Sequence, residues 1–179
     1  MSTFIGIDPG VNGGIAILSG ESLTLIDMPP TAEDLYTRLK YGWDSKYPVR
    51  AVIEKVTGYI PKGKTKSGGD RKHGGQPGSS MFELGINYGW CQMCLVSLGF
   101  SDRTSQSVAP ITWQKSLGIN IPPGLEYDQR KRELHSWARR LIPDTKISRQ
   151  CADAALLALY AQRLYQSSVS TSFSEKQHG

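Results

Sequence analysis

The sequence has few cysteines, and their number and placement exclude some classes of protein. Its 179 residues include Cys91, Cys94 and Cys151. An odd number of cysteines without a secretion signal argues against a disulfide scaffold and for reduced thiols in a cytoplasm. Cys91 and Cys94 form a single Cys-x-x-Cys motif with no second pair, so a zinc site is not expected and both are interpreted as core residues.

Long apolar runs are also missing. No stretch approaches the roughly 20 residues that a membrane span needs. The N-terminus has no basic region followed by an apolar core, so neither a signal peptide nor a transit peptide is expected. Apolar residues make up 39% of the chain, which is ordinary for a globular protein. We therefore expect a cytoplasmic protein with one domain over residues 1–166 and a disordered, Ser-rich tail over residues 167–179.

Acidic residues are fewer than basic ones, and the excess is unevenly placed. The formal charge is +5, from 21 basic and 16 acidic residues. One basic group comprises Lys62, Lys64, Lys66, Arg71 and Lys72, and a second comprises Arg130, Lys131, Arg132, Arg139 and Arg140. Two basic zones around an acidic centre favour a polyanion held against a metal site. Solvated loops and helix faces carry such charge as well.

The first third of the chain reads mainly as short strands. Apolar segments over residues 3–8, 13–18 and 22–27 are separated by Gly and Ser, and their short connections predict an antiparallel meander. Thr31 is expected to cap a helix that runs to about Tyr41, and residues 49–54 are expected to form a fourth strand. The Gly-, Lys- and Ser-rich residues 57–80 predict a mobile loop.

The rest of the chain is expected to be mainly helical. Helices are predicted over residues 80–98, 128–142 and 150–165, and a short one runs from Pro110 to about Gly118 after a fifth strand over residues 104–109. Ser80 and Glu83 match a capping box, which explains Glu83 by structure alone. Gly85 and Gly89 lie four residues apart on one helix face, which indicates that the sheet or a partner helix approaches closely there.

Three acids lie in unusually apolar surroundings. Asp8 ends the first predicted strand, Glu54 ends the fourth, and Asp153 lies within the apolar segment 152–157. If the two strands are neighbours, Asp8 and Glu54 emerge at one edge of the sheet, and a last helix across that edge brings Asp153 to them. Three clustered carboxylates do not all stay ionised without cations. One or two Mg²⁺ ions, with Mn²⁺ as a substitute, would satisfy them, and a two-metal site serves in-line phosphodiester cleavage.

Each of the three acids also has a purely structural explanation. An Asp before Pro-Gly initiates turns, a Glu at the end of a strand can simply be solvated, and an Asp at the start of a helix can cap it. The three contexts taken together favour a functional site over three separate coincidences.

Five segments, in order along residues 4–160, resemble the RuvC-like Holliday junction resolvases of the ribonuclease H-like superfamily, particularly their phage and plastid-type branch. The segments are 7–10 with 13–16, 52–55, 78–82 with Gly85, Tyr88 and Gly89, 110–118 with Trp113 and Lys115, and 152–154 with Leu156 and Leu157. The resemblance implies an α/β fold with a five-stranded mixed sheet flanked by helices. It also implies a homodimer, in a bacterial or phage-infected cell, that binds a four-way DNA junction and nicks two opposed strands.

The resemblance further implies roles for single residues. Asp8, Glu54 and Asp153 would be the catalytic metal ligands, and Lys115 would contact the scissile phosphate. Ser80 and Phe82 would lie near the centre of the junction, where an aromatic ring can insert between bases. Phosphate contacts would come from the basic residues Lys62, Lys64, Lys66, Arg71, Lys72, Arg130 and Lys131.

The chain departs from the pattern of the relatives in two ways. Relatives usually carry a further acid or a histidine three or four residues before the last Asp, where this chain has Arg149 and Gln150. They often place a lysine directly after the Trp, where this chain has Gln114. The first departure keeps open a non-catalytic or weakly active junction-binding protein on the same fold.

The sequence allows two other functions. One is a nuclease of the same superfamily that acts on other branched DNA or on RNA. The other is an ATP-binding domain of the actin-like group, which also uses an Asp-x-Gly turn after a strand. It is less favoured, because that fold is normally duplicated and this chain is too short for two copies.

Overall fold

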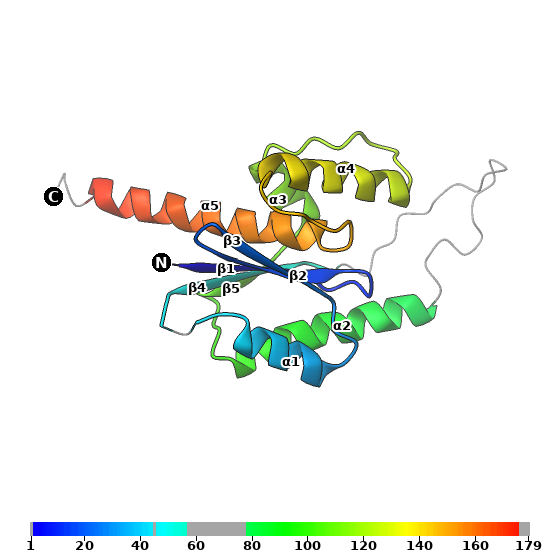
Figure 1. Ribbon diagram of the computed structural model, residues 1–179, viewed down its shortest axis with the longest axis horizontal. Helices are drawn as coiled ribbons and strands as arrows, with labels where there is room; N and C mark the ends of the chain where they lie inside the picture. Colours follow the sequence, from blue (N-terminus) through cyan, green and yellow to red (C-terminus); the bar gives the residue numbers. More distant parts are fainter. Residues whose placement is uncertain (1, 45, 57–77, 176–179) are drawn as a thin grey trace.

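The computed structural model describes residues 2–44, 46–56 and 78–175, and for residues 78–80 and 168–175 it describes the backbone alone. Its centre is a five-stranded sheet in the order β3-β2-β1-β4-β5 (Figure 1). The strands are β1 (Thr3–Asp8), β2 (Gly14–Ser19), β3 (Ser22–Asp27), β4 (Val49–Glu54) and β5 (Ser105–Val108). The first three are antiparallel, and β4 and β5 run parallel to β1, which confirms the expected α/β fold and mixed sheet.

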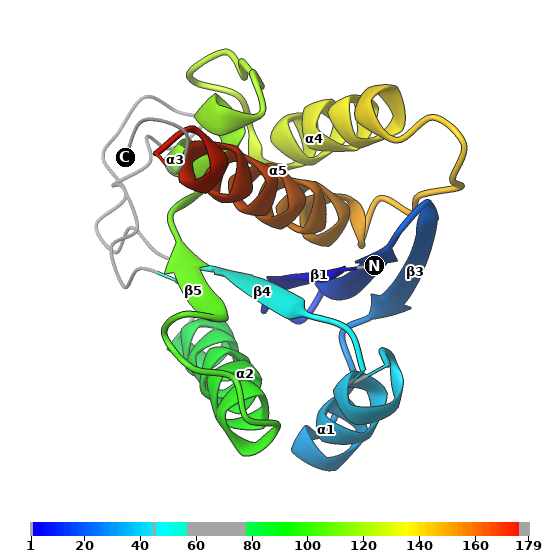
Figure 2. The ribbon, with the colours of Figure 1, turned by 90° about the vertical axis from the view of Figure 1, so that its left-hand side faces the viewer.

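Helices cover both faces of this sheet (Figure 2). One face carries α1 (Ala32–Tyr41) and α2 (Gly78–Ser97), and the other carries α3 (Pro110–Ser116), α4 (Tyr127–Leu141) and α5 (Ala152–Glu175). The strand and helix bounds agree with the predicted ones to within two residues, except at the end of α5. The side-chain oxygen of Thr31 accepts a hydrogen bond from the backbone N–H of Asp34, as expected of a helix cap.

The last helix is longer than the sequence pattern predicted. It continues to Glu175 rather than ending near residue 165, and so enters the segment that was expected to be a disordered tail. The physical reason is that no Gly or Pro follows its first turn before residue 179, so nothing in the chain stops a helix that packing has already nucleated.

Alternation along β1 divides the core into two layers. Ile5 and Ile7 point to the side of α1 and α2, where they join a buried cluster that includes Leu35 and Leu95. Phe4 points to the side of α5. The strand is buried along its whole length, as expected for the central strand of a sheet covered on both faces.

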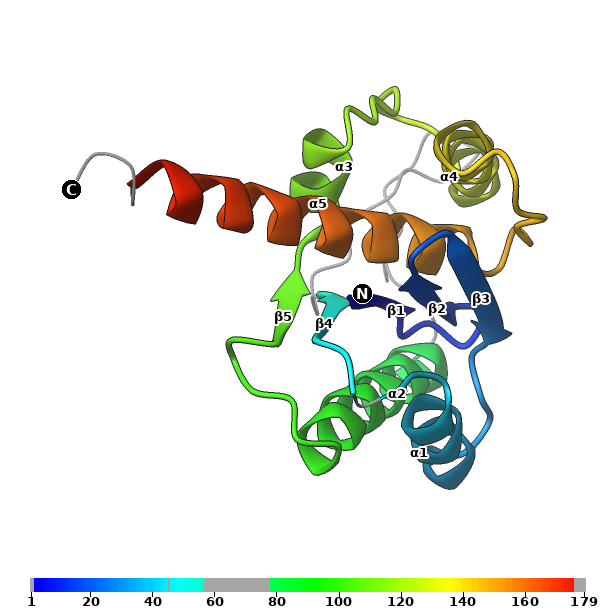
Figure 3. The same ribbon diagram turned by 60° about the vertical axis from the view of Figure 1, so that its left-hand side comes forward.

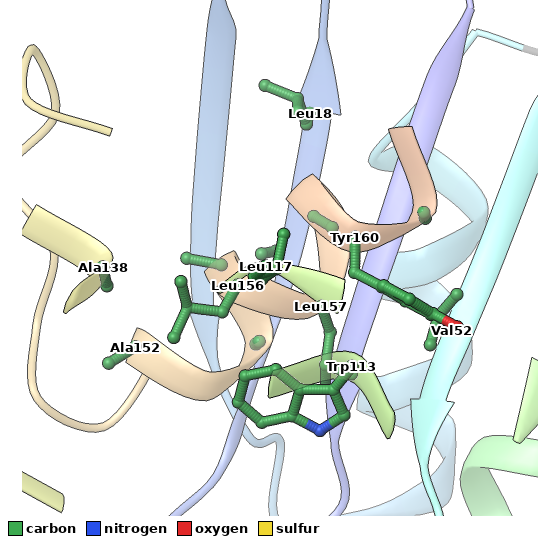
Figure 4. Packing of buried hydrophobic residues seen from close by; sticks show 14 of the residues in the cluster. Leu18, Val52, Trp113, Leu117, Ala138, Ala152, Leu156, Leu157 and Tyr160 are labelled. Atoms are coloured by element: carbon green, nitrogen blue, oxygen red, sulfur yellow. The ribbon is translucent and has the colours of Figure 1, made fainter. Parts of the chain in front are cut away.

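On the α5 side the packing is unusually close. A Cβ atom on Gly6 would clash with the backbone carbonyl oxygen of Ala154 and the backbone nitrogen of Ala158. Figure 4 shows α5 residues such as Leu156 and Leu157 packed between the sheet and Trp113 of α3. The small residues of α5 let its backbone rest directly on β1, which fixes where the helix begins relative to the end of the strand.

Two predictions about the chain as a whole can be compared with these residues. Among the described residues no helix combines the length and the apolarity that a membrane span requires. All three cysteines are free and buried, which confirms Cys91 and Cys94 as core residues.

Candidate metal centre

The ends of two parallel strands bring the first two acids together. Because β1 and β4 pair in parallel with Ile7 opposite Ile53, both strands end at the same edge of the sheet, where Asp8 and Glu54 follow. The helix α5 begins at this edge and places Asp153 in its first turn. Asp8, Glu54 and Asp153 each offer a carboxylate oxygen, and these oxygens lie within 4.8 Å of one another. The predicted trio therefore meets in space.

Each oxygen of Asp8 has a different partner. Its Oδ1 accepts a hydrogen bond from the backbone N–H of Gly10 at 3.2 Å, which fixes the turn after β1. Its Oδ2 accepts one from the Nζ of Lys131 at 3.1 Å. Oδ1 thus forms the turn that the structural explanation predicts, while Oδ2 is paired with Lys131.

Asp153 is the most enclosed of the three acids, with 4% of its surface exposed. Its Oδ2 accepts a hydrogen bond from the Nζ of Lys131 at 2.6 Å. Its Oδ1 is buried and has no hydrogen-bond partner within the described part of the chain. A buried carboxylate oxygen without a partner is unfavourable, so this oxygen is free to accept a ligand.

Lys131 lies at the centre of the site rather than on its rim. From the sequence it was interpreted as a contact to DNA phosphates, but in the structure its ammonium group bridges Asp8 and Asp153. A signal for this position was present in the sequence. Lys131 precedes Leu134 and Ala138 by three and seven residues, and these two residues form the buried face of α4.

The ionisation of the site shows a shortage of positive charge. Burial, together with the negative charges of Asp8 and Asp153, raises the pKa of Glu54 to about 8. Burial also raises the pKa of Asp153, against the opposing effect of Lys131. For Lys131 burial lowers the pKa, but the attraction of Asp8 and Asp153 outweighs it and raises the pKa overall. One ammonium group does not balance three carboxylates.

The three acids lie in a cleft of about 530 Å³, which extends to the loop after β1, to α2 and to α4. Glu83 on α2 lines this cleft. The sequence assigned Glu83 to a capping box with Ser80, but α2 begins at Gly78, so Ser80 lies within the helix and not at its cap. The missed signal was that Glu83 is the single charged residue in the sequence of α2.

Two neighbours on α3 have opposite environments. Gln114 lines the cleft and is 8% exposed, and its Nε2 is buried without a hydrogen-bond partner within the described part of the chain. Lys115 is exposed and is not among the residues that line the cleft. Successive helical residues point about 100° apart, so of these two neighbours it is Gln114 that lines the cleft.

Arg149 and Gln150 do not lie on α5, as the sequence had suggested, but in the turn before it. The guanidinium of Arg149 pairs with the carboxylate of Asp128 at 2.7 Å. These two positions therefore add no ligand to the centre, whose acidic cluster comprises three residues within the described ranges.

The remaining residues predicted to bind DNA are distributed as follows. Arg130 lines the cleft, and Phe82 is exposed on α2, with 70% of its surface accessible. Ser80 is described by its backbone alone. The basic residues Lys62, Lys64, Lys66, Arg71 and Lys72 lie outside the described residues.

The chemistry of the donor set fits a hard divalent cation. Carboxylate oxygens are the ligands that Mg²⁺ prefers, three of them converge, and one oxygen of Asp153 lacks a partner. Beside burial, the negative charges of Asp8 and Asp153 raise the pKa of Glu54, so a further positive charge here would favour its ionised form. The residues present are therefore suited to Mg²⁺ or Mn²⁺.

Sheet order and site together define an α/β protein with an acidic centre at the edge where parallel strands end. Comparison with solved structures identifies the fold more specifically. A structure described as T. thermophilus RuvC in complex with Holliday junction substrate matches with a TM-score of 0.56 and 14% identity over 89% of this chain and 92% of that one. A second Thermus thermophilus RuvC structure matches with a TM-score of 0.55 and 14% identity over 88% and 92%.

The fold is therefore RuvC-like, within the ribonuclease H-like class, as the sequence motifs had indicated. No protein-family profile matches the sequence, and no curated protein matches it. At 14% identity the likeness establishes the fold.

Proposed function

We propose that the protein is a Mg²⁺-dependent endonuclease that resolves four-way DNA junctions by paired, symmetric nicks. One observation carries the proposal: three carboxylate oxygens converge within 4.8 Å in a cleft that is also lined by Arg130 and Lys131. Acids that hold a divalent cation beside basic groups that hold a phosphate are the parts that phosphodiester hydrolysis requires. The fold match to a resolvase structure with a junction substrate supports this choice of DNA.

In this proposal Asp8, Glu54 and Asp153 hold Mg²⁺ or Mn²⁺, with two ions in the complete site. The chemistry that such ions supply when bound is activation of water and stabilisation of the charge that develops on the phosphate. Arg130 presents a planar guanidinium in the cleft, which suits two oxygens of one phosphate. Gln114 offers a neutral donor where relatives often carry a lysine, and Lys115 is assigned to a phosphate outside the cleft.

The wider DNA surface is proposed from charge and exposure. Phe82, exposed on α2, would insert between bases at the centre of the junction. Ser80 and the basic residues Lys62, Lys64, Lys66, Arg71 and Lys72 would contact the backbone of the arms.

A homodimer is part of the same proposal, because two symmetric nicks need two sites. The face of α2 supports it. Phe82, Met93 and Val96 are exposed there, and a Cβ on Gly85 or Gly89 would meet no described atom within 4 Å. Within the described residues the sheet does not approach these glycines, and this supports the partner helix that the sequence suggested as the other possibility.

The test is a cleavage assay on a synthetic four-way junction with each strand labelled in turn, in Mg²⁺ and then in Mn²⁺. We expect wild-type protein to nick two opposed strands at equivalent positions. Asp8→Asn should abolish nicking, with a loss of at least about a thousandfold in rate, yet leave junction binding near normal, because the variant removes a metal ligand and not a DNA contact. Cutting by Asp8→Asn at the wild-type rate would refute the metal centre.

A second candidate is a junction-binding protein with little or no catalysis. It is favoured by Lys131, which already pairs with two of the three carboxylates, and by the absence of a fourth acid from the cluster in the described ranges. Tight junction binding without nicking in either metal would support this candidate. Competition by linear duplex, other branched DNA and RNA hairpins at a stated salt concentration would identify the preferred nucleic acid.

A further inference from the structure

Lys131 contacts one carboxylate oxygen on each of two acids that would bind the metal. Its Nζ lies 3.1 Å from Oδ2 of Asp8 and 2.6 Å from Oδ2 of Asp153. The lysine side chain is 14% exposed, and those of the two acids are 11% and 6% exposed. This is an enclosed, charge-assisted contact, in which the surrounding protein weakens solvent screening.

An ammonium group and a divalent cation do not fit this place together. Mg²⁺ lies about 2.0–2.1 Å from its ligand oxygens, so an ion shared by Asp8 and Asp153 would lie close to the present position of the Lys131 Nζ. Both groups are positive, and they would repel each other strongly at such short range.

We propose that Lys131 is a built-in competitor of the metal: it holds Asp8 and Asp153 together as their counter-ion, and it must withdraw before a divalent cation can bridge them. The inference rests on the metal site of the proposed function, but not on DNA or on cleavage. It predicts that the chain's own lysine sets how weakly the site binds metal.

The withdrawn side chain has a place to go. Lys131 lines the cleft beside Arg130, and the cleft volume of about 530 Å³ leaves room for the lysine to turn away from the acids. Its stem is flexible, and its three donors can be hydrated or can meet a phosphate there. Metal entry would thus transfer one positive charge from the acids to the cleft.

The direct test measures Mn²⁺ binding to DNA-free protein. Titration calorimetry and the electron paramagnetic resonance signal of free Mn²⁺ give the affinity independently. Lys131→Met keeps the length of the side chain and removes its charge. We expect this variant to bind Mn²⁺ at least about tenfold more tightly than wild type, equal to about 1.4 kcal/mol. In EDTA it should melt roughly 10 °C lower, because two buried carboxylates lose their counter-ion.

Two variants control for charge and for structure. Arg132→Met removes one positive charge from the next residue of α4, which is exposed and does not line the cleft, and should leave the Mn²⁺ affinity within about twofold of wild type. Lys131→Arg keeps a cation between the acids and should not tighten binding. A general structural defect would weaken metal binding, so only competition predicts a gain.

A measurement on wild type keeps the inference testable even where Lys131→Met fails to fold. Reductive methylation followed by mass spectrometry reports how accessible each lysine is. Mn²⁺ should increase the labelling of Lys131 at least about threefold, because the ammonium leaves its enclosed contact.

Unchanged or weaker Mn²⁺ binding by Lys131→Met would overturn the inference, and so would labelling of Lys131 that Mn²⁺ leaves unaltered. These outcomes are separate from the failure of the proposed function. A wild-type protein that binds Mn²⁺ in competition with Lys131 but does not cut junctions would retain the inference and lose the nuclease.

Discussion

The two longest helices lie on opposite faces of the sheet and are attached to it in different ways (Figure 3). On one face, α5 lies directly against the backbone of β1, where Gly6 leaves no room for a Cβ atom. On the other, α2 packs through the side chains of Cys91 and Leu95, and its Gly85 has no described neighbour within 4 Å. The helix whose backbone lies directly against β1 is therefore the one that carries Asp153.

Gly6→Ala is expected to have the largest effect on this comparison. The added methyl group would meet backbone atoms of Ala154 and Ala158, which no side-chain rotation can move aside. We expect the free energy of unfolding to fall by about 3 kcal/mol or more, measured by urea denaturation. Because α5 would be pushed away from β1, Asp8 and Asp153 would separate and Mn²⁺ affinity would fall as well.

Gly89→Ala is the matched control, since it adds the same methyl group to the helix on the other face. It should leave Mn²⁺ affinity unchanged. Equal losses of stability and of Mn²⁺ binding in the two variants would show that the close contact at Gly6 does not position the site.

The stability of the protein at different pH values tests the ionisation of Glu54 at the acidic centre. The pKa of Glu54 is raised from 4.5 to about 8, by burial first and then by Asp8 and Asp153. Between these values the folded protein holds a proton that the unfolded chain has released. The free energy of unfolding in EDTA should therefore decrease as the pH rises from about 4.5 to about 8.

Urea unfolding at several pH values across this window measures the effect, and Glu54→Gln supplies the comparison. The variant cannot ionise at residue 54, so its stability should fall less steeply with pH. A slope that is the same in both proteins would show that Glu54 does not hold the proton. Saturating Mn²⁺ should reduce the wild-type slope by binding the ionised carboxylate.

Gly85→Ala is expected to have the smallest effect on the free energy of unfolding, and to raise it where Gly6→Ala lowers it. Its position on α2 is exposed, and Ala favours a helix interior over Gly by about 0.5–1 kcal/mol. We expect the free energy of unfolding of the monomer to rise by that amount in chemical denaturation at low protein concentration. A loss of stability at high concentration only would instead indicate that a second copy packs on Gly85.

The sequence allowed the two sheet-edge acids to be predicted because their signal is local. Asp8 and Glu54 each follow an apolar strand, and parallel strands end at a common edge. Asp153 was found because an acid among alanines and leucines needs a partner. Asp8 and Glu54 required no knowledge of how the helices cross the sheet, whereas joining Asp153 to them assumed that the last helix lies across that edge.

Lys131 could not be assigned in the same way, because its role depends on where α4 lies over the cleft. Charge placed it with Arg130 and Arg132, which suggested a contact to DNA phosphates. The spacing to Leu134 and Ala138 separates Arg130 and Lys131, which both line the cleft, from the exposed Arg132, but it does not tell the first two apart. Lys115 and Gln114 posed the same problem on α3, where the neighbour without a charge is the one that lines the cleft.

Asp8 and Asp153 lie on β1 and α5, two elements that pack closely together but are far apart in the sequence. The meander β1–β3 can form from local contacts, but the pairing of α5 with β1 requires nearly the whole chain to be synthesised. A nascent or truncated chain that lacks α5 therefore has Asp8 without Asp153. Metal binding would then report completed folding, and incomplete translation products would be unable to assemble the acidic centre.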